Sequence, residues 1–387
     1  MHPCSLALIT LALVKCHALT PKRVLVVGGS GRVGASTVRW IDRLATEQLP
    51  VELAIGGRRR ASFDAAAKRL GAKGVDAIKF VQLDLDDAAS LERAVAGRSL
   101  VVHTAGPFQQ RTDPTLLKAC IAAGVPYCDV CDELELSRAA KKLTSHCDVP
   151  AVISCGIWPG ASALLAARAA ERLGKPLDDL EFSFFTSGTG GAGPTIVSAT
   201  FLLLCTPAAV YADGELVMKE PWTEKRTAAF GPGIGERDVY LLDNPDVPTC
   251  AEALGARSAS SSFGTAPAFW NDLFGAMKLL PRSLLADRGA MQNLAEFSMP
   301  IIRTVDALVG GVNAMRVDAR AADGDAVTLR VAHGDLEDCV GQATAAFGME
   351  LLRGGVAPGC WYPAELPVDA RGRILAVVEE GAVVWEV

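Results

Sequence analysis

The sequence has little of what marks a membrane protein or a nucleic-acid-binding protein. Its apolar run Ser5–Val14 is shorter than the about 20 residues that a membrane-spanning helix needs, so no stable span is expected. The net charge is −6, and this lack of positive charge makes a basic surface for nucleic acid unexpected. What remains is a chain of 387 residues, 50% of them hydrophobic, which is ample for a large core and favours two domains.

The cysteines lack the pattern of a disulfide framework. Of the 11, Cys4 and Cys16 lie near the start, and the remaining nine have irregular spacings. Cys128 and Cys131 form a C-x-x-C motif, but positions three apart on a strand point to opposite faces. A metal site also needs further ligands at suitable spacing. We expect no disulfide framework and no metal site.

The first 18 residues resemble a secretory-type leader. Ser5–Val14 matches the apolar region of a signal peptide, and Cys16–Ala18 offers small residues at the cleavage positions. The alternative is a frayed N-terminal segment of a cytoplasmic enzyme. A secretory-type leader conflicts with cysteines that show no disulfide pattern, because secreted proteins usually form disulfides. The hypothesis that resolves this conflict is a plastid location, reached through the secretory route as in algae with complex plastids.

Strand-like and helix-like segments alternate six times from Arg23 onward. Continuous apolar runs such as 23–27 are typical of strands that are buried on both faces of a parallel sheet. The alternation predicts an α/β fold with a doubly wound, Rossmann-type parallel sheet over residues 19–176. We expect its strands at 23–27, 51–55, 78–83, 100–104, 126–130 and 151–155, with helices at 34–44, 62–70, 91–96, 113–123 and 134–143.

A second, α+β domain is expected over residues 177–335, for substrate binding or dimerisation. We expect it to be an antiparallel sheet that offers a possible homodimer face. Asp335 is expected to cap a helix from Leu336, and residues 336–387 to return to the first domain as a C-terminal helix and tail. The predicted strands of the second domain are 180–186, 312–320 and 326–332, with helices near 268–280 and 297–308.

The turn after the first strand carries the main chemical signal. Residues 28–34 fit G-x-G-x-x-G between a predicted strand and a predicted helix. Glycines permit a tight turn and the close approach of a pyrophosphate, and the N–H groups at the helix start then face the anion. The alternative is a structural turn without a ligand. We predict that a dinucleotide contacts Gly28, Gly29, Ser30, Gly31, Arg32, Val33 and Gly34.

The end of the second strand favours NADP over NAD as the cofactor. An NAD site usually carries an acidic residue there, but Glu52 lies at the wrong end of the strand. At the right end stand Arg58, Arg59 and Arg60, and a guanidinium can hold the 2′-phosphate of NADP with two donors. Arg58 is the best candidate because it is nearest the strand. The alternative for the three arginines is a solvated helix start.

The third and fourth strands also end at expected cofactor contacts. Asp84 or the backbone of Leu85 is expected to contact the adenine, whereas Asp86–Asp87 are expected to cap the next helix. Ala105 and Gly106 leave room for a cofactor at the end of the fourth strand.

Four motifs in order, VLVVGGSGRVG, GGRRR, LDLDD and TAGPF, resemble the NADP-binding domain of the saccharopine dehydrogenase family. Later segments agree, namely PYCDVCDE from Pro126, GIWPGASALLA from Gly156, SGTGGAGPTIVSAT from Ser187 and LLRGGVAPGCWYPAEL from Leu351. The resemblance covers residues 23–200 and 325–365 and implies NADP-linked redox chemistry at a carbon–nitrogen bond.

The chain departs from this family at one turn. In the saccharopine-forming branch the turn reads Gly-Leu-Asp-Pro-Gly, whereas this chain has Ile157 and Trp158 in the middle positions. The missing acidic residue puts saccharopine itself in doubt as a substrate. A Trp158 side chain that faces the cleft would favour a less polar ligand, and the alternative is a core position.

Together, the motifs and the resemblance predict an NADP-dependent oxidoreductase that acts on a small molecule, such as an amino acid or imine, at a C–N bond. The alternative is a catalytically inactive NAD(P)-binding protein that acts through protein interaction.

No catalytic residue is evident. His103 and Tyr127 are weak candidates for a proton donor, and a satisfied buried histidine is the alternative for His103. Asp129 and Asp132 are expected to line the substrate cleft or to cap the following helix.

Overall fold

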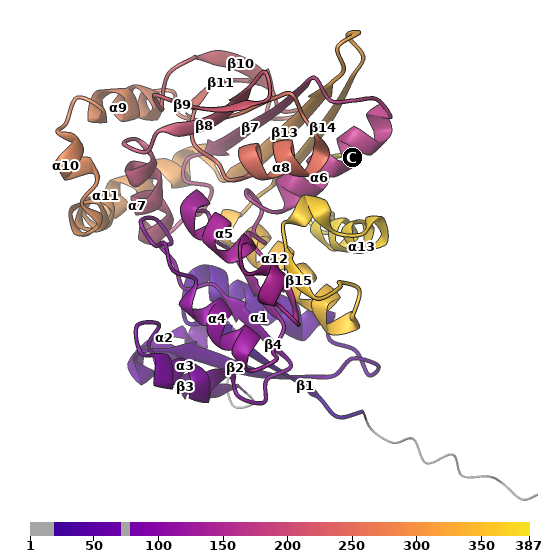
Figure 1. Ribbon diagram of the computed structural model, residues 1–387. Helices are drawn as coiled ribbons and strands as arrows, with labels where there is room; N and C mark the ends of the chain where they lie inside the picture. The colour runs from indigo at the N-terminus through magenta and orange to yellow at the C-terminus, as the bar shows by residue number, and fades with distance from the viewer. Residues whose placement is uncertain (1–18, 71–77) are drawn as a thin grey trace, which may run out of the picture.

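The computed structural model describes residues 19–70 and 78–387, so the predicted leader lies outside the described residues. Two sheets dominate the molecule, one in a lower domain coloured indigo to purple and one in an upper domain coloured rose to orange (Figure 1). No helix in the described part of the chain is both long and apolar enough to cross a membrane.

The first sheet confirms the predicted doubly wound fold. Its seven strands are all parallel and lie in the order β15-β6-β5-β4-β1-β2-β3. The chain runs outward from β1 through β2 and β3 and then returns to the other side of β1, so a topological switch point lies between β1 and β4. The strands are β1 (Lys22–Val27), β2 (Val51–Gly57), β3 (Lys79–Gln82), β4 (Leu100–His103), β5 (Tyr127–Asp129), β6 (Pro150–Val152) and β15 (Gly359–Trp361).

Helices cover both faces of this sheet because alternate residues of each strand point to opposite sides. Val24 and Val26 of β1 pack in one core with α1, α2 and α12. Leu25 and Val27 pack in a second core with α3, α4 and α5. The helices are α1 (Arg32–Leu44), α2 (Arg60–Leu70), α3 (Ala88–Val95), α4 (Thr115–Ala122), α5 (Leu134–Lys141) and α12 (Leu336–Arg353).

The second sheet has nine strands and confirms an α+β second domain. The prediction that it is antiparallel was wrong at its centre, where β7 pairs parallel with β12 and antiparallel with β13. A parallel pair needs a crossover connection, and α8 supplies it directly before β12. The strands are β7 (Asp179–Ser187), β8 (Ala208–Ala212), β9 (Glu215–Lys219), β10 (Arg226–Ala229), β11 (Glu236–Leu241), β12 (Ser258–Ala266), β13 (Val312–Arg320), β14 (Ala326–His333) and β16 (Val384–Glu386).

The helices of the second domain form two groups. Residues of α6 and α8 share a core with β7, β13 and β14, whereas α7, α9 and α11 form a separate apolar cluster. Helices α9 to α11 lie along the left flank of the upper domain (Figure 1). The helices are α6 (Ala161–Leu173), α7 (Pro194–Leu203), α8 (Asp246–Leu254), α9 (Phe269–Met277), α10 (Arg282–Leu285), α11 (Arg288–Val309) and α13 (Val368–Val378), with short 3₁₀ turns at Thr144–His146 and Pro363–Glu365.

The C-terminal segment connects the two domains. Asp335 caps α12 as expected, because its carboxylate accepts a hydrogen bond of 2.8 Å from the N–H of Asp338. Helix α12 packs along α1, β15 forms one edge of the first sheet, and β16 forms one edge of the second. The segment from α12 to β16 therefore contributes to both domains.

Candidate active site

A cavity of about 670 Å³ lies at the carboxyl ends of the first sheet. Residues that follow β1, β2, β4 and β5 form one wall, and residues of β7, α7, β12 and the loop after β11 form the opposite wall. This is the crevice at the topological switch point where ligands bind in open α/β sheets.

The glycine turn is built to present the start of α1 to this cavity. Gly28 has φ of +83°, and its carbonyl accepts a hydrogen bond of 2.8 Å from the N–H of Gly31. Gly31 caps α1 without any side-chain hydrogen bond, so the first N–H groups of the helix are not satisfied by a cap. A Cβ on Gly34 would lie 2.3 Å from the Gly28 carbonyl oxygen, so only glycine lets α1 pack on the turn.

Five of the seven predicted turn residues line the cavity. These are Gly28, Gly31, Arg32, Val33 and Gly34. Gly29 does not line it, because it packs against Ile55 of β2, whose Cγ1 would lie 2.8 Å from an added Cβ. Ser30 does not line it either. The dinucleotide contact of all seven residues stays a prediction.

Arg32 ties the glycine turn to the second domain. Its Nε donates to the Glu337 carboxylate, and its Nη2 donates to the Gly191 carbonyl at 2.7 Å. The same carboxylate accepts from the N–H of Gly193 at 2.8 Å. Burial raises the pKa of Glu337, and the Arg32 guanidinium opposes that rise. The loop before α7 is thus held against the start of α1.

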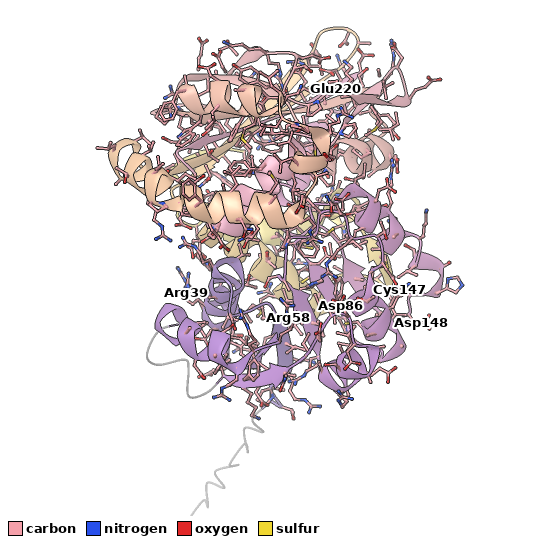
Figure 2. All side chains as sticks on the ribbon, turned by 90° about the vertical axis from the view of Figure 1, so that its left-hand side faces the viewer. Arg39, Arg58, Asp86, Cys147, Asp148 and Glu220 are labelled. Atoms are coloured by element: carbon pink, nitrogen blue, oxygen red, sulfur yellow. The ribbon has the colours of Figure 1, made fainter. Side chains whose placement is uncertain are left out.

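The three arginines after β2 have different surroundings. Arg58 and Arg59 are exposed, line the cavity and form no ion pair with any residue in ranges 19–70 and 78–387. Arg60 instead pairs with Asp64 at 3.0 Å and lies over the rings of Phe63 and Phe80. Figure 2 shows Arg58 on the side of the molecule that carries α2, below the second domain. Two of the three guanidinium groups are therefore available to an anionic ligand in the cavity.

Of the cofactor contacts predicted at the ends of the third and fourth strands, only those at the fourth strand line the cavity. Ala105 and Gly106 line the cavity after β4. Asp84 and Leu85 do not line it, and Leu85 packs against the core beneath α3 and α4. Asp87 caps α3 as expected, since its carboxylate accepts a hydrogen bond of 3.1 Å from the N–H of Ala89.

His103 and Tyr127, the candidate proton donors, do not line the cavity. His103 Nδ1 lies 3.0 Å from the Tyr127 hydroxyl, which donates to Asp129 Oδ2 at 3.0 Å. Burial lowers the pKa of His103 to about 3, raises that of Asp129 to about 6 and raises that of Tyr127. The geometry favours the alternative of a buried histidine, although its Nε2 has no partner in the described chain.

Two polar side chains of the loops after β4 and β5 do reach the cavity. Asp132 lines it, and burial raises the pKa of its carboxyl to about 6. Gln109 also lines it, is only 3% exposed and lies beside Asp132, where its amide lowers the pKa of that carboxyl. Its amide oxygen and nitrogen make no hydrogen bond of good geometry with the described residues, so the amide still has capacity to bind a ligand or water.

The opposite wall supplies a carboxyl that the sequence did not reveal. Asp243, in the loop between β11 and α8, lines the cavity and accepts a hydrogen bond of 2.8 Å from the N–H of Ala209. Burial raises its pKa to about 6, with Glu133 nearby adding to the rise. The loop sequence Asp-Asn-Pro indicates only a turn. Nothing local in the sequence distinguishes Asp243 from a surface turn residue.

Comparisons with known proteins agree on the fold and on the cofactor domain. Residues 24–153 match the sequence model of the saccharopine dehydrogenase NADP binding domain. An apo, histidine-tagged saccharopine dehydrogenase (L-Glu forming) from Saccharomyces cerevisiae matches 93% of this chain and 97% of its own, with 16% identity and a TM-score of 0.62. None of the curated proteins matches the chain.

Two other solved structures match only part of the chain. Pen from Bacillus thuringiensis covers 34% of this chain and 49% of its own, with 15% identity and a TM-score of 0.27. AtPrR2 with NADP+ and (+)pinoresinol covers 28% of this chain and 36% of its own, with 24% identity and a TM-score of 0.22. The family model makes the chain saccharopine dehydrogenase-like in its NADP-binding domain, which indicates an oxidoreductase, and the yeast structure makes it so in its fold.

Proposed function

We propose that this saccharopine dehydrogenase-like chain is an NADP-dependent oxidoreductase that acts at the C–N bond of a small amine or imine, amino acids included. The observation that carries the proposal is the composition of one cavity. Its first wall holds the uncapped start of α1 with Arg58 and Arg59, and its loops and second wall hold Asp132 and Asp243. Groups suited to a dinucleotide phosphate and groups suited to a nitrogen centre thus face the same space.

The residues of the first wall fit NADP. The N–H groups at the start of α1 suit a pyrophosphate, and Gly31 is exposed with nothing but the Gly28 carbonyl near an added Cβ. Arg58 and Arg59 suit the 2′-phosphate, which supports a preference for NADP over NAD. When bound, the cofactor supplies or accepts the hydride. The chain itself has to bind it, orient it and exclude water.

Asp132 and Asp243 suit the proton and the charge of a nitrogen substrate. A carboxyl with a pKa of about 6 changes protonation near neutral pH, which suits a general acid or base. Neither carboxyl forms an ion pair within the described part of the chain, so an ammonium or iminium group would be a complementary partner. In this proposal, one carboxyl oxygen holds the proton that the nitrogen gains or loses.

The proposal is tested by measuring NADPH oxidation with a panel of imines and ketones, and NADP+ reduction with a panel of amino acids. We expect turnover with imines, or with ketones in the presence of an amine, and slower turnover with NADH. The alternative of an inactive NAD(P)-binding protein predicts NADPH binding by titration calorimetry without turnover on any member of the panel. Turnover with ketones alone would support an oxidoreductase but overturn the C–N assignment.

A further inference from the structure

A second cavity of about 360 Å³ adjoins the first one. It lies in the second domain among α7, α9 and α11, and we call it the annex. The two cavities share the lining residues Trp158, Ile196, Thr200, Phe263 and Leu336. Trp158, which stands where the saccharopine-forming branch has an acidic residue, lines both cavities and so forms part of the wall between them. Its ring packs on that of Phe184, with centroids 5.2 Å apart.

The annex is built for apolar groups. Among the residues that the structure describes, no charged side chain lines it, and aromatic and aliphatic residues such as Phe274, Met277 and Ile302 form most of its surface. Its hydroxyl groups are already used as donors inside the protein. Thr186 and Thr265 donate to the Gly188 carbonyl, Thr189 to Asp306, Thr200 to the Ile196 carbonyl, and Ser298 to the Leu294 carbonyl.

The size of the annex suits a substantial substituent. An engineered apolar cavity of about 150 Å³ stays dry and takes up benzene, so a cavity of 360 Å³ has room for a group about twice as large. Leu273 and Leu280, which line the annex, are 45% and 39% exposed. Apolar side chains therefore continue from the annex to the surface of the molecule.

We propose that the substrate is an amine, or the corresponding imine, with an apolar substituent that occupies the annex while its nitrogen lies in the main cavity beside Asp132, Asp243 and Gln109. This inference rests on the proposed function for the nitrogen end only. The buried amide of Gln109, which lies beside Asp132, provides hydrogen bonds at that end, and the carboxylates provide the opposite charge. A charged amino acid side chain would be disfavoured because none of the described residues that line the annex carries a charge.

Titration calorimetry with n-alkylamines from n-butylamine to n-octylamine tests the proposal, with and without saturating NADP+. We expect affinity to rise roughly fourfold per methylene group, as for transfer of a buried methylene from water, until the annex is filled. We expect n-octylamine to bind more tightly than n-octanol, and n-octanoate to bind most weakly. An affinity that does not depend on chain length, or no binding of any of these amines, would overturn the proposal.

Two matched variants on α11 locate the binding site. Ser298 and Thr304 both donate to the carbonyl four residues earlier, but Ser298 is half-buried on the annex whereas Thr304 is exposed. Ser298→Trp should fill the annex and abolish the gain from n-butylamine to n-octylamine, and Thr304→Trp should retain it. Ser298→Met is the milder variant if the tryptophan prevents folding, and it should shorten the chain length at which affinity stops rising.

The outcomes separate the two proposals. If both tryptophan variants keep the same dependence on chain length, the annex is not the binding site and the inference fails. If the amines bind as expected but NADPH is never oxidised with their imines, the annex inference stands and the proposed function fails.

Discussion

The two walls of the cleft are assembled in different ways. The wall from the first domain uses backbone N–H groups, glycines and two arginines that lie within or directly after single βα turns. The wall from the second domain uses side chains from β7, α7, β12 and a loop, which are far apart in the sequence. In the proposed function, the cofactor contacts depend on local backbone geometry, whereas the substrate contacts combine Asp132 of the first wall with Asp243 of the second and so depend on long-range packing. This difference predicts how each set of contacts responds to substitution.

The largest expected effect is on the carboxyls of the substrate side. Asp243→Asn and Asp132→Asn should each lower kcat by about 10²–10⁴, the usual contribution of a positioned acid or base, while leaving NADPH affinity unchanged. Steady-state kinetics and NADPH titration measure the two quantities. Asp42→Asn on the exposed face of α1 is the control. A larger loss of kcat in folded His103→Gln than in either aspartate variant would contradict this assignment.

The next effect concerns the choice of cofactor on the first wall. Arg58→Ala and Arg59→Ala should each weaken NADPH binding about tenfold or more, because a hydrogen bond to a charged group contributes about 1.5–3 kcal/mol. NADH lacks the 2′-phosphate and should bind almost as before. Arg60→Ala is the matched control, since Arg60 pairs with Asp64. An unchanged NADPH-to-NADH affinity ratio in the Arg58, Arg59 double variant would refute the NADP preference.

A smaller effect is expected from the glycine turn. Gly31→Ala should lower the affinity for both NADPH and NADH about tenfold, the equivalent of one hydrogen bond to a phosphate. Its folding should be largely intact, because the added Cβ meets only the Gly28 carbonyl, at 3.2 Å. Calorimetric titration gives the affinities and thermal unfolding gives the stability. Unchanged affinities would rule out this placement of the pyrophosphate.

The smallest effect is a pH-dependent gain in stability on the substrate side. The folded protein raises the pKa of Asp243 from 3.8 to about 6, so it favours the protonated carboxyl. The stability that this carboxyl contributes is present below about pH 4 and is lost as the pH rises through 6. Asp243→Asn should therefore raise the free energy of unfolding by about 1–2 kcal/mol at pH 8 and have little effect at pH 4.

Urea unfolding of wild type and variant at the two pH values measures this difference, with Asp42→Asn again as the control. A loss of stability at pH 8 would show that Asp243 holds the wall together. In that case Asp243 would serve the packing of the second wall, and its assignment to the substrate would fail.

Much of the first domain could be predicted from sequence because its signals are local. The six predicted strands and the alternating helices follow from apolar runs and the 3.6-residue helical period, and Asp87 and Asp335 are recognisable as helix caps. The glycine turn follows from its place between a strand and a helix. The parallel β7–β12 pair was missed because its strands are far apart in the chain. The β8–β9 and β10–β11 hairpins were also missed, although each is local and Asp213-Gly214 between β8 and β9 is a hairpin signal.

The sequence by itself determined the α/β fold, the glycine turn after β1 and the place of the arginines after β2, because each depends on residues close together along the chain. Only the tertiary structure decided which side chains share the cleft. It brought Asp243 opposite the first sheet, placed Trp158 between two cavities and removed His103 and Tyr127 from the cleft lining. The physical reason is packing, since the twist of two sheets and the helices between them determine which strand ends meet.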